Sequence, residues 1–135
     1  MSKTPAPKHS DSEIDSILSL AHAAGLVAAN ACTPIPMTVA QHANPFSDAS
    51  PVLQSYHVPS GVCGFAWVNV KPGTSRLAKR MLATGVGRKD GYYGGVTRWV
   101  SEFGQSMQKK EAFATAFARV LEQHGYPAHM MSRMD

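Results

Sequence analysis

The stretch Val62-Cys63-Gly64-Phe65-Ala66-Trp67-Val68-Asn69-Val70 is nearly continuous in apolar residues. Turn-forming residues bound it on both sides, with Pro-Ser-Gly at 59–61 and Lys-Pro-Gly at 71–73. A short apolar run between turn signals, rich in β-branched and aromatic residues, is typical of a buried strand. The stretch therefore predicts the central strand of a sheet.

Alternation along this strand gives it two unlike faces, because successive side chains of a strand point to opposite sides. One face carries small residues, Val62, Gly64, Ala66, Val68 and Val70. The other carries Cys63, Phe65, Trp67 and Asn69. We expect helices to pack on the small-residue face.

The length and composition of the chain predict one domain. The chain has 135 residues, of which 44% are hydrophobic, enough for one core. We expect a flexible tail at 1–10 and a single α+β domain at 11–135. With two cysteines and no apolar leader at the start, the chain is typical of a reducing, cytosolic compartment. No apolar stretch of membrane-spanning length is expected, so no membrane partner is predicted.

The N-terminal part is expected to hold one helix and one arm. Ser10 and Glu13 have capping-box spacing, and apolar residues follow at helical spacing, which predicts a helix at 11–29. Gly25 weakens that helix or breaks it. Residues 31–60 contain five prolines and no sustained periodicity. They predict an extended, irregular arm, of a length that usually signals a functional loop or a segment ordered by a partner.

The region 61–135 predicts a βαβαβ core. A helix at about 75–84 takes its N-cap from the stretch Gly73-Thr74-Ser75 and ends at Gly85. A glycine-rich hairpin or hinged loop at 87–95 leads into a strand at 96–100. A helix starting after Ser106 ends at Gly125, and a strand at 128–133 closes the chain. We expect a small antiparallel or mixed sheet with two helices on one face, in a ferredoxin-like βαββαβ arrangement. The N-terminal helix would cover a sheet edge or the other face.

Positive charge is concentrated in one segment. The whole chain has a formal charge of +4, whereas residues 71–98 carry seven basic residues and only Asp90 as an acid, a net +6. Such asymmetry favours a polyanionic partner, nucleic acid or an acidic protein surface.

Aromatic residues accompany this charge. If the face with Phe65 and Trp67 is open and flanked by Tyr92, Tyr93 and Trp99, it forms a stacking platform of the kind that holds single strands. The alternative is that the first helix or the arm covers Phe65 and Trp67 as ordinary core. The predicted nucleic-acid-binding residues are Phe65, Trp67, Arg76, Lys79, Arg80, Arg88, Lys89, Tyr92, Tyr93 and Arg98.

No motif predicts catalysis, a metal or a cofactor. Cys32, His42, His57 and Cys63 are zinc-ligand types, but their spacing contains no C-x2-C or H-x3-H half-site, so core and loop roles are favoured. A nucleophilic Cys63 with His57 is disfavoured, because burial in an apolar strand makes a thiol a poor nucleophile. Phosphate-loop, serine-hydrolase and paired-acid motifs are absent from the sequence. We therefore expect that the protein is not an enzyme.

Three segments carry a resemblance to a known family. They are residues 56–68 (YHVPSGVCGFAWV), residues 110–118 (KEAFATAFA) and the ending Ser132-Arg133-Met134-Asp135. Over roughly residues 32–135 the chain resembles an uncharacterised family of small tailed-bacteriophage proteins. The resemblance implies a phage origin and expression in the host bacterial cytoplasm, and it implies no reaction.

Two functions follow as predictions. The first is a small phage-type accessory protein that binds nucleic acid or another polyanion through the basic, aromatic segment 71–99. The alternative is a virion or assembly component, a homo-oligomer or virion subunit whose tail and arm pack on neighbouring subunits.

Overall fold

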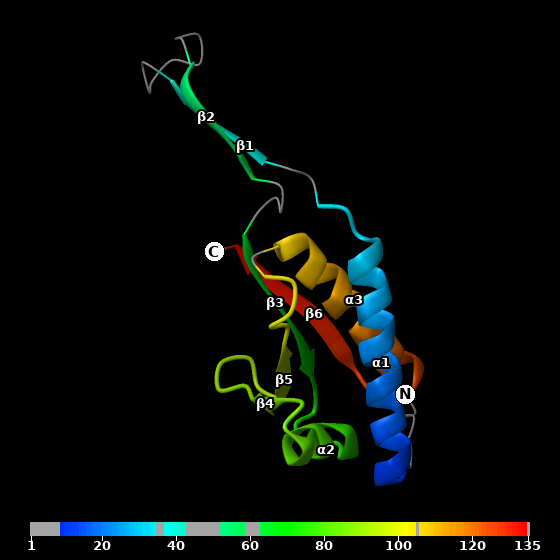
Figure 1. The fold of residues 1–135 in the computed structure, drawn as a ribbon. Helices are drawn as coiled ribbons and strands as arrows, with labels where there is room; N and C mark the ends of the chain where they lie inside the picture. The colour runs from blue at the N-terminus through cyan, green and yellow to red at the C-terminus, as the bar shows by residue number, and fades with distance from the viewer. Residues whose placement is uncertain (1–8, 35–36, 43–51, 59–62, 105, 135) are drawn as a thin grey trace, which may run out of the picture.

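A computed structural model describes residues 9–34, 37–42, 52–58, 63–104 and 106–134, with backbone alone for 37–42 and 52–58. Within these residues the protein is α+β, with three helices, a four-stranded antiparallel sheet and a separate pair of strands (Figure 1). The elements are α1 (Asp11–Ala31), β1 (Met37–His42), β2 (Val52–Val58), β3 (Gly64–Val70), α2 (Arg76–Thr84), β4 (Arg88–Lys89), β5 (Val96–Trp99), α3 (Met107–Gln123) and β6 (Ala128–Met134).

The four-stranded sheet has the order β4-β5-β3-β6, and each neighbouring pair is antiparallel. The predicted central strand is therefore confirmed as β3, although its predicted start, Val62, lies outside the described residues. β3 pairs with β5 from Val70↔Val96 to Trp67↔Trp99, and with β6 along its whole length. Of the two alternatives for residues 87–95, the hairpin is confirmed, because β4 and β5 pair on either side of a loop.

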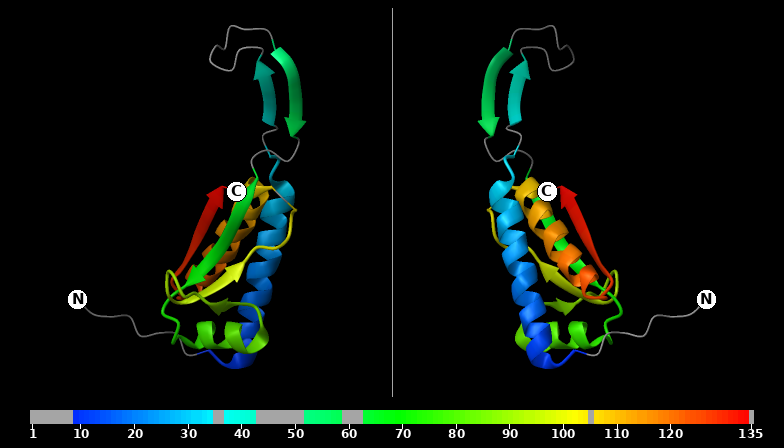
Figure 2. Two further views of the ribbon diagram at one scale, coloured as in Figure 1. Left: turned by 90° about the vertical axis from the view of Figure 1, so that its left-hand side faces the viewer. Right: turned by 90° about the vertical axis from the view of Figure 1, so that its right-hand side faces the viewer.

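The small-residue face of β3 packs on helices, as expected. Ala66, Val68 and Val70 are fully buried in one core with Phe113 and Phe117 of α3. Figure 2 shows the strands in front of α1 and α3 in one view and behind them in the other. α2 lies at one end of the sheet, on the same side as the other helices (Figure 1). The opposite face of the sheet is left without a helix among the described residues.

The ends of α2 and α3 follow the predicted caps. The Ser75 hydroxyl accepts a hydrogen bond from the Ala78 amide, and Gly85 ends α2 in the left-handed region at φ 76°. At the start of α3 the Ser106 hydroxyl accepts from the Lys109 amide, and Gly125 beyond its end has φ 91°. Glycine adopts this region without the clash that a Cβ causes, which is why both helices stop at a glycine.

The first helix packs closely on the last one. Its capping box is confirmed, because the Ser10 hydroxyl accepts from the Glu13 amide and the Glu13 carboxylate accepts from the Ser10 amide. Gly25 does not break the helix. It is buried where a Cβ would lie 2.6 Å from the Phe113 ring, so its lack of a side chain lets the two helices approach. The expectation that this helix covers an edge or the other face is wrong, since it joins the helix layer beside α3.

The length and composition of α1 differ from the expectation that no stretch could span a membrane. By length and mean hydropathy it is the one described helix that is apolar enough to cross a membrane, where the sequence had predicted none. Core helices of soluble proteins pass the same test. Six residues of α1 are buried, namely Ile14, Ile17, Leu18, Ala21, Gly25 and Ala29.

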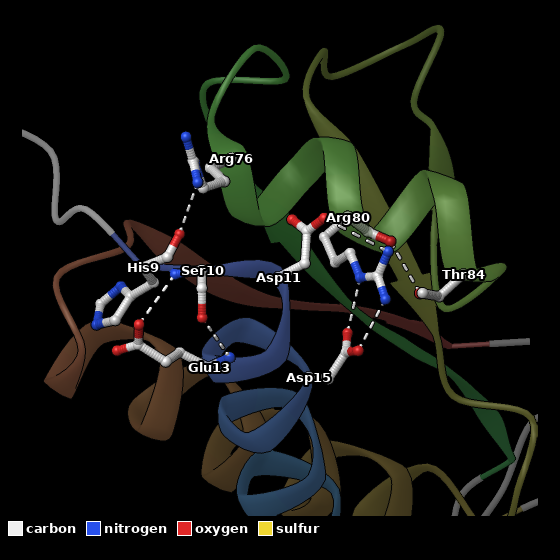
Figure 3. Close-up of polar contacts among 8 residues, drawn as sticks. All are labelled: His9, Ser10, Asp11, Glu13, Asp15, Arg76, Arg80 and Thr84. Atoms are coloured by element: carbon white, nitrogen blue, oxygen red, sulfur yellow. Dashed lines mark hydrogen bonds and ion pairs between the residues drawn. The ribbon is translucent and has the colours of Figure 1, made fainter.

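The last two residues of the predicted tail, His9 and Ser10, belong to the folded domain. His9 Nδ1 lies 2.7 Å from the Tyr126 hydroxyl, and the His9 carbonyl accepts from Arg76 Nη1 at 2.9 Å. Ser10 belongs to the α1 cap (Figure 3). These two residues are therefore held on the domain, and the rest of the predicted tail, 1–8, lies outside the described residues.

The predicted arm contains two strands. β1 and β2 pair in antiparallel register from Met37↔Val58 to His42↔Val52, with an irregularity next to His42. The prediction of an irregular arm is wrong for these two segments. Figure 1 shows the pair standing apart from the helices and the four-stranded sheet.

Candidate nucleic-acid interface

Five aromatic side chains meet on the face of the sheet that no described helix covers. We call them the aromatic platform: Phe65, Trp67, Tyr92, Tyr93 and Trp99. Trp67 and Trp99 stack at a centroid distance of 5.2 Å with planes 8° apart. The Phe65 ring lies 5.6 Å from Trp99, and the Tyr93 ring lies 6.3 Å from Trp67. Tyr92 packs edge-to-face on Tyr93 at 4.6 Å. The residues singled out in the sequence are thus brought together.

The side chains of the platform differ widely in solvent exposure. Trp67 is only 7% exposed, whereas Tyr93 is 43%, Trp99 45% and Tyr92 86% exposed. Trp67 is thus buried, as the alternative expected, but the first helix does not cover it or Phe65, because that helix lies in the layer on the other side of the sheet (Figure 2). The part of the alternative that concerns the arm involves side chains outside the described residues. Among the described residues, the Trp67 ring packs against Trp99 and Tyr93. The buried Trp67 ring is thus joined by three rings that are between 43% and 86% exposed. A contiguous exposed patch of this kind is often an interaction site.

The carboxylate of Asp90 fixes the backbone of the loop that carries Tyr92 and Tyr93. Asp90 Oδ1 accepts hydrogen bonds from the Tyr92 and Tyr93 amides, and Oδ2 accepts from the Thr97 hydroxyl at 2.7 Å. The hydrogen bond from the Tyr93 amide has the largest effect on Asp90, and the one from the Thr97 hydroxyl is next. Both hold the pKa of Asp90 below its usual range. A side chain that bonds its own backbone two and three residues on fixes a turn.

The sheet anchors the far end of the same loop. The Asn69 side-chain amide donates to the Gly94 carbonyl at 2.9 Å. Gly95 has φ 70°, and a Cβ there would overlap the Val70 carbonyl oxygen, so only glycine fits. The loop that carries Tyr92 and Tyr93 is therefore fixed to β3 at one end and to its own aspartate at the other.

Arg88 is the predicted cation that the register places on the platform side. It pairs with Thr97, which pairs with Asn69, so these residues share the open face. Lys89 pairs with Val96 and falls on the other side of this short edge strand. Both basic residues are exposed, and neither has an ion-pair partner among the described residues.

The predicted cations of α2 are not part of the platform. Arg80 makes two hydrogen bonds of 2.8 Å to the Asp15 carboxylate and a longer ion pair of 3.8 Å to Asp11 (Figure 3). This pairing lowers the pKa of Asp15 and raises that of Arg80. Arg76 is bonded to the His9 carbonyl, and Lys79 is exposed on the same helix. α2 thus uses two of its three cations to hold the N-terminal segment.

Arg98 lies on the helix side of the sheet. Its guanidinium makes two hydrogen bonds to Glu102, at 2.9 and 3.0 Å, and sits 4.7 Å from the Phe113 ring centroid. The Arg98 bonds lower the pKa of Glu102 from 4.5 to about 2. Arg98 therefore has a structural role, and the structure does not bring it to the platform.

Three residues of β6 reach the platform face and were missed in the sequence. Register places Arg133 opposite Phe65, Met131 opposite Trp67 and His129 opposite Asn69. The guanidinium carbon of Arg133 lies 5.5 Å from the Phe65 ring centroid. Alternation along the predicted strand 128–133 indicated that these three residues share a face. It could not show that this strand pairs with β3, which is what brings them to the platform.

The structure gives little support to the other candidate sites, which are the two thiols and the zinc-ligand set. Cys32 and Cys63 are free thiols and half-buried. The described residues contain no group of three metal-ligating side chains, and the side chains of His42 and His57 lie outside what the structure describes. A cavity of about 880 Å³ lies between α1, the segment 84–88 and β5, and its lining includes Arg88 and Trp99.

Compared with known proteins, the chain matches no family model, no curated protein and no solved structure.

Proposed function

We propose that this protein binds single-stranded nucleic acid on the aromatic platform, as a binding module and not an enzyme. The observation that carries the proposal is the stacked Trp67–Trp99 pair with half-exposed rings around it, on a sheet face without a described helix. Aromatic side chains on a four-stranded sheet stack two or three bases in known RNA-binding modules. Each stacked base contributes about 1–3 kcal/mol by alanine substitution.

The backbone phosphates would lie toward the basic residues at the platform's edges. Arg88 stands at the β4 edge and Arg133 on β6, while Lys89, next to Arg88, lies on the reverse side of the same edge strand. Each of them is exposed. This set replaces the sequence-based one, since Arg80 and Arg98 are already occupied by carboxylates.

We further propose that the core is ferredoxin-like and the protein of phage origin, acting in the host bacterial cytoplasm. The fold proposal is supported by the chain order β3-α2-β4-β5-α3-β6 together with the spatial order β4-β5-β3-β6. The origin is supported by the resemblance of residues 32–135 and stays a prediction.

A titration series tests the binding. Fluorescence anisotropy of a labelled oligothymidylate would be recorded at several salt concentrations for the wild type, Arg88→Ala/Lys89→Ala and Tyr92→Ala/Tyr93→Ala. The basic pair should weaken binding and flatten the salt dependence, since each phosphate contact contributes about −0.7 to the slope of log affinity against log salt. The tyrosine pair should weaken binding with little change in slope, because stacking releases no counterions.

Lys79→Ala is the matched control, because Lys79 is an exposed cation of the same basic segment but lies on α2. It should change the affinity less than the Arg88/Lys89 pair does. Equal losses from both would mean that the charge acts without a defined surface. No salt-dependent binding by the wild type at low ionic strength would end the proposal.

The second candidate, a virion or assembly component, is supported by the β1–β2 pair. An isolated two-stranded ribbon is at best marginally stable in water, so a ribbon standing apart from the core is consistent with contact on a neighbouring subunit. Sedimentation analysis separates the two candidates. A defined oligomer without affinity for DNA or RNA would favour assembly.

A further inference from the structure

Lys110 of α3 is a buried cation with little to balance it. The residue is 6% exposed, and its ammonium donates one hydrogen bond, to the Gly64 carbonyl at 3.2 Å. The same ammonium lies 5.4 Å from the Phe65 ring centroid. No carboxylate among the described residues lies within ion-pair distance of it.

This arrangement costs stability. A buried charge normally has an opposite charge and hydrogen bonds for all its polar groups, and an ammonium has three N–H donors. One carbonyl and one ring face satisfy only part of this requirement. Lysine is almost never buried without a partner. An anion from outside the chain would complete the set.

Two further positive features border the same end of β3, around Phe65. Arg133 of β6 lies 5.5 Å from the same Phe65 ring and has no ion pair within the described part of the chain. The N-terminus of α3 lies there as well, since Ser106 bridges to Cys63 at the start of β3. The first turn of α3 holds no acid. The charge of Lys110 therefore adds to the positive end of the helix dipole, and no acidic residue in the first turn offsets it.

The nearest acid in sequence does not cancel this charge. The Glu111 carboxylate accepts a hydrogen bond of 2.7 Å from the Ser132 hydroxyl, which fixes it between α3 and β6. With Lys110 and Arg133 against Glu111, the formal charge of the cluster is +1.

We infer that this cluster is a binding site for a phosphate group, formed by Lys110 and Arg133 at the Phe65 end of the platform. As a nucleic-acid site it rests on the proposed function, because a phosphate held there would belong to a strand whose bases stack on the neighbouring rings. Lys110 supplies the buried, oriented donor. Arg133, exposed on β6, supplies a planar donor set suited to phosphate oxygens.

Three variants of the full chain test the site: Lys110→Met, Arg133→Gln and the control Lys109→Met, which removes a charge from the neighbouring position. Inorganic phosphate binding is followed by NMR titration, and oligothymidylate binding by anisotropy. Lys110→Met and Arg133→Gln should each weaken phosphate binding about tenfold, the loss expected for one charge-assisted hydrogen bond. Lys109→Met should weaken it much less.

Thermal unfolding adds a readout that separates function from structure. Lys110→Met should leave the melting temperature unchanged or raise it, because it replaces a poorly compensated buried charge by an apolar chain of similar length. A clear fall would overturn the inference, because it would mean that the charge of Lys110 is already compensated within the chain.

The two proposals fail in different ways. Phosphate binding that depends on Lys110, in a protein that binds no oligothymidylate, would retain the anion site and end the proposed function. Oligothymidylate binding that is unchanged in Lys110→Met and Arg133→Gln would retain the function and end the site.

Discussion

Trp67 of β3 and Trp99 of β5 stand directly opposite each other in the sheet, with ring planes 8° apart. Cross-strand neighbours on one face lie close enough for large rings to stack, and such pairs stabilise a sheet by about 0.2–1 kcal/mol beyond an alanine pair. Because the strands are antiparallel and the register is fixed, this pair also sets where Phe65 and Tyr93 lie. One cross-strand pair therefore organises the open face.

Asp90→Ala should release the loop that carries the tyrosines. The change removes the acceptor for the Tyr92 and Tyr93 amides and for the Thr97 hydroxyl. We expect faster hydrogen exchange at both amides and weaker oligothymidylate binding, with a loss of about 1–2 kcal/mol in the free energy of unfolding. Unchanged exchange at Tyr92 and Tyr93 would show that the glycines alone hold the loop.

Glu102 should make the protein sensitive to acid. Its pKa in the folded state, about 2, lies below the ordinary 4.5, because Arg98 stabilises the charged carboxylate. A lowered folded pKa means that the pair's contribution to stability is complete above about pH 4.5 and is lost as the pH falls toward 2.

Glu102→Gln should therefore flatten the dependence of the unfolding free energy on pH across that window. At neutral pH the variant should lose about 1 kcal/mol, because the pair is partly exposed. Urea unfolding at a series of pH values measures both effects. Profiles for the two proteins that stay parallel from pH 5 to about 2 would contradict the assigned pairing.

Gly25→Ala should destabilise the protein although alanine is the better helix former. The new Cβ would lie 2.6 Å from the Phe113 ring, so α1 and α3 must separate or the ring must move. We expect a loss of about 1–3 kcal/mol from overpacking, against about 1 kcal/mol gained in helix propensity. Gly91→Ala is the control, since nothing lies within 4 Å of its added Cβ. A stabilised Gly25→Ala would mean that the helices are less tightly packed.

Phe117→Ala should destabilise by about 3–5 kcal/mol. The side chain is 1% exposed and stacks on Phe113 at 5.8 Å, under the small-residue face of β3. Chemical denaturation measures the change. A loss below about 1 kcal/mol would place the wrong face of α3 against the sheet.

The sequence predicted the elements better than their contacts. The central strand, the caps at Ser10, Ser75 and Ser106 and the glycine stops depend on local chemistry, which a single sequence carries. Strands 37–42 and 52–58 were missed because nearby prolines dominated the composition, although Val52-Leu53-Gln54-Ser55-Tyr56-His57-Val58 is rich in strand-forming residues. The place of α1 depends on how Gly25 meets Phe113, a contact between distant parts of the chain.

The site was predicted in its aromatic part and not in its charges. Alternation along the strand predicted that Phe65 and Trp67 share one face. The pairing register of β3 with β5 then places Trp99 opposite Trp67 on that face. A count of basic residues cannot tell which are already paired. Glu102, four residues after Arg98, was a local hint of their pairing, whereas Asp15 and Arg80 are 65 residues apart and meet only through the fold.

The most direct test of the account is a titration of intrinsic tryptophan fluorescence with oligothymidylate. The chain has two tryptophans, Trp67 and Trp99, and both lie in the platform. Bases that stack there must therefore change the emission of the protein. We predict saturable quenching at low salt that is lost in Trp99→Ala. Binding detected by anisotropy without any change in tryptophan emission, or no binding at all, would contradict the claim that the aromatic platform holds nucleic acid.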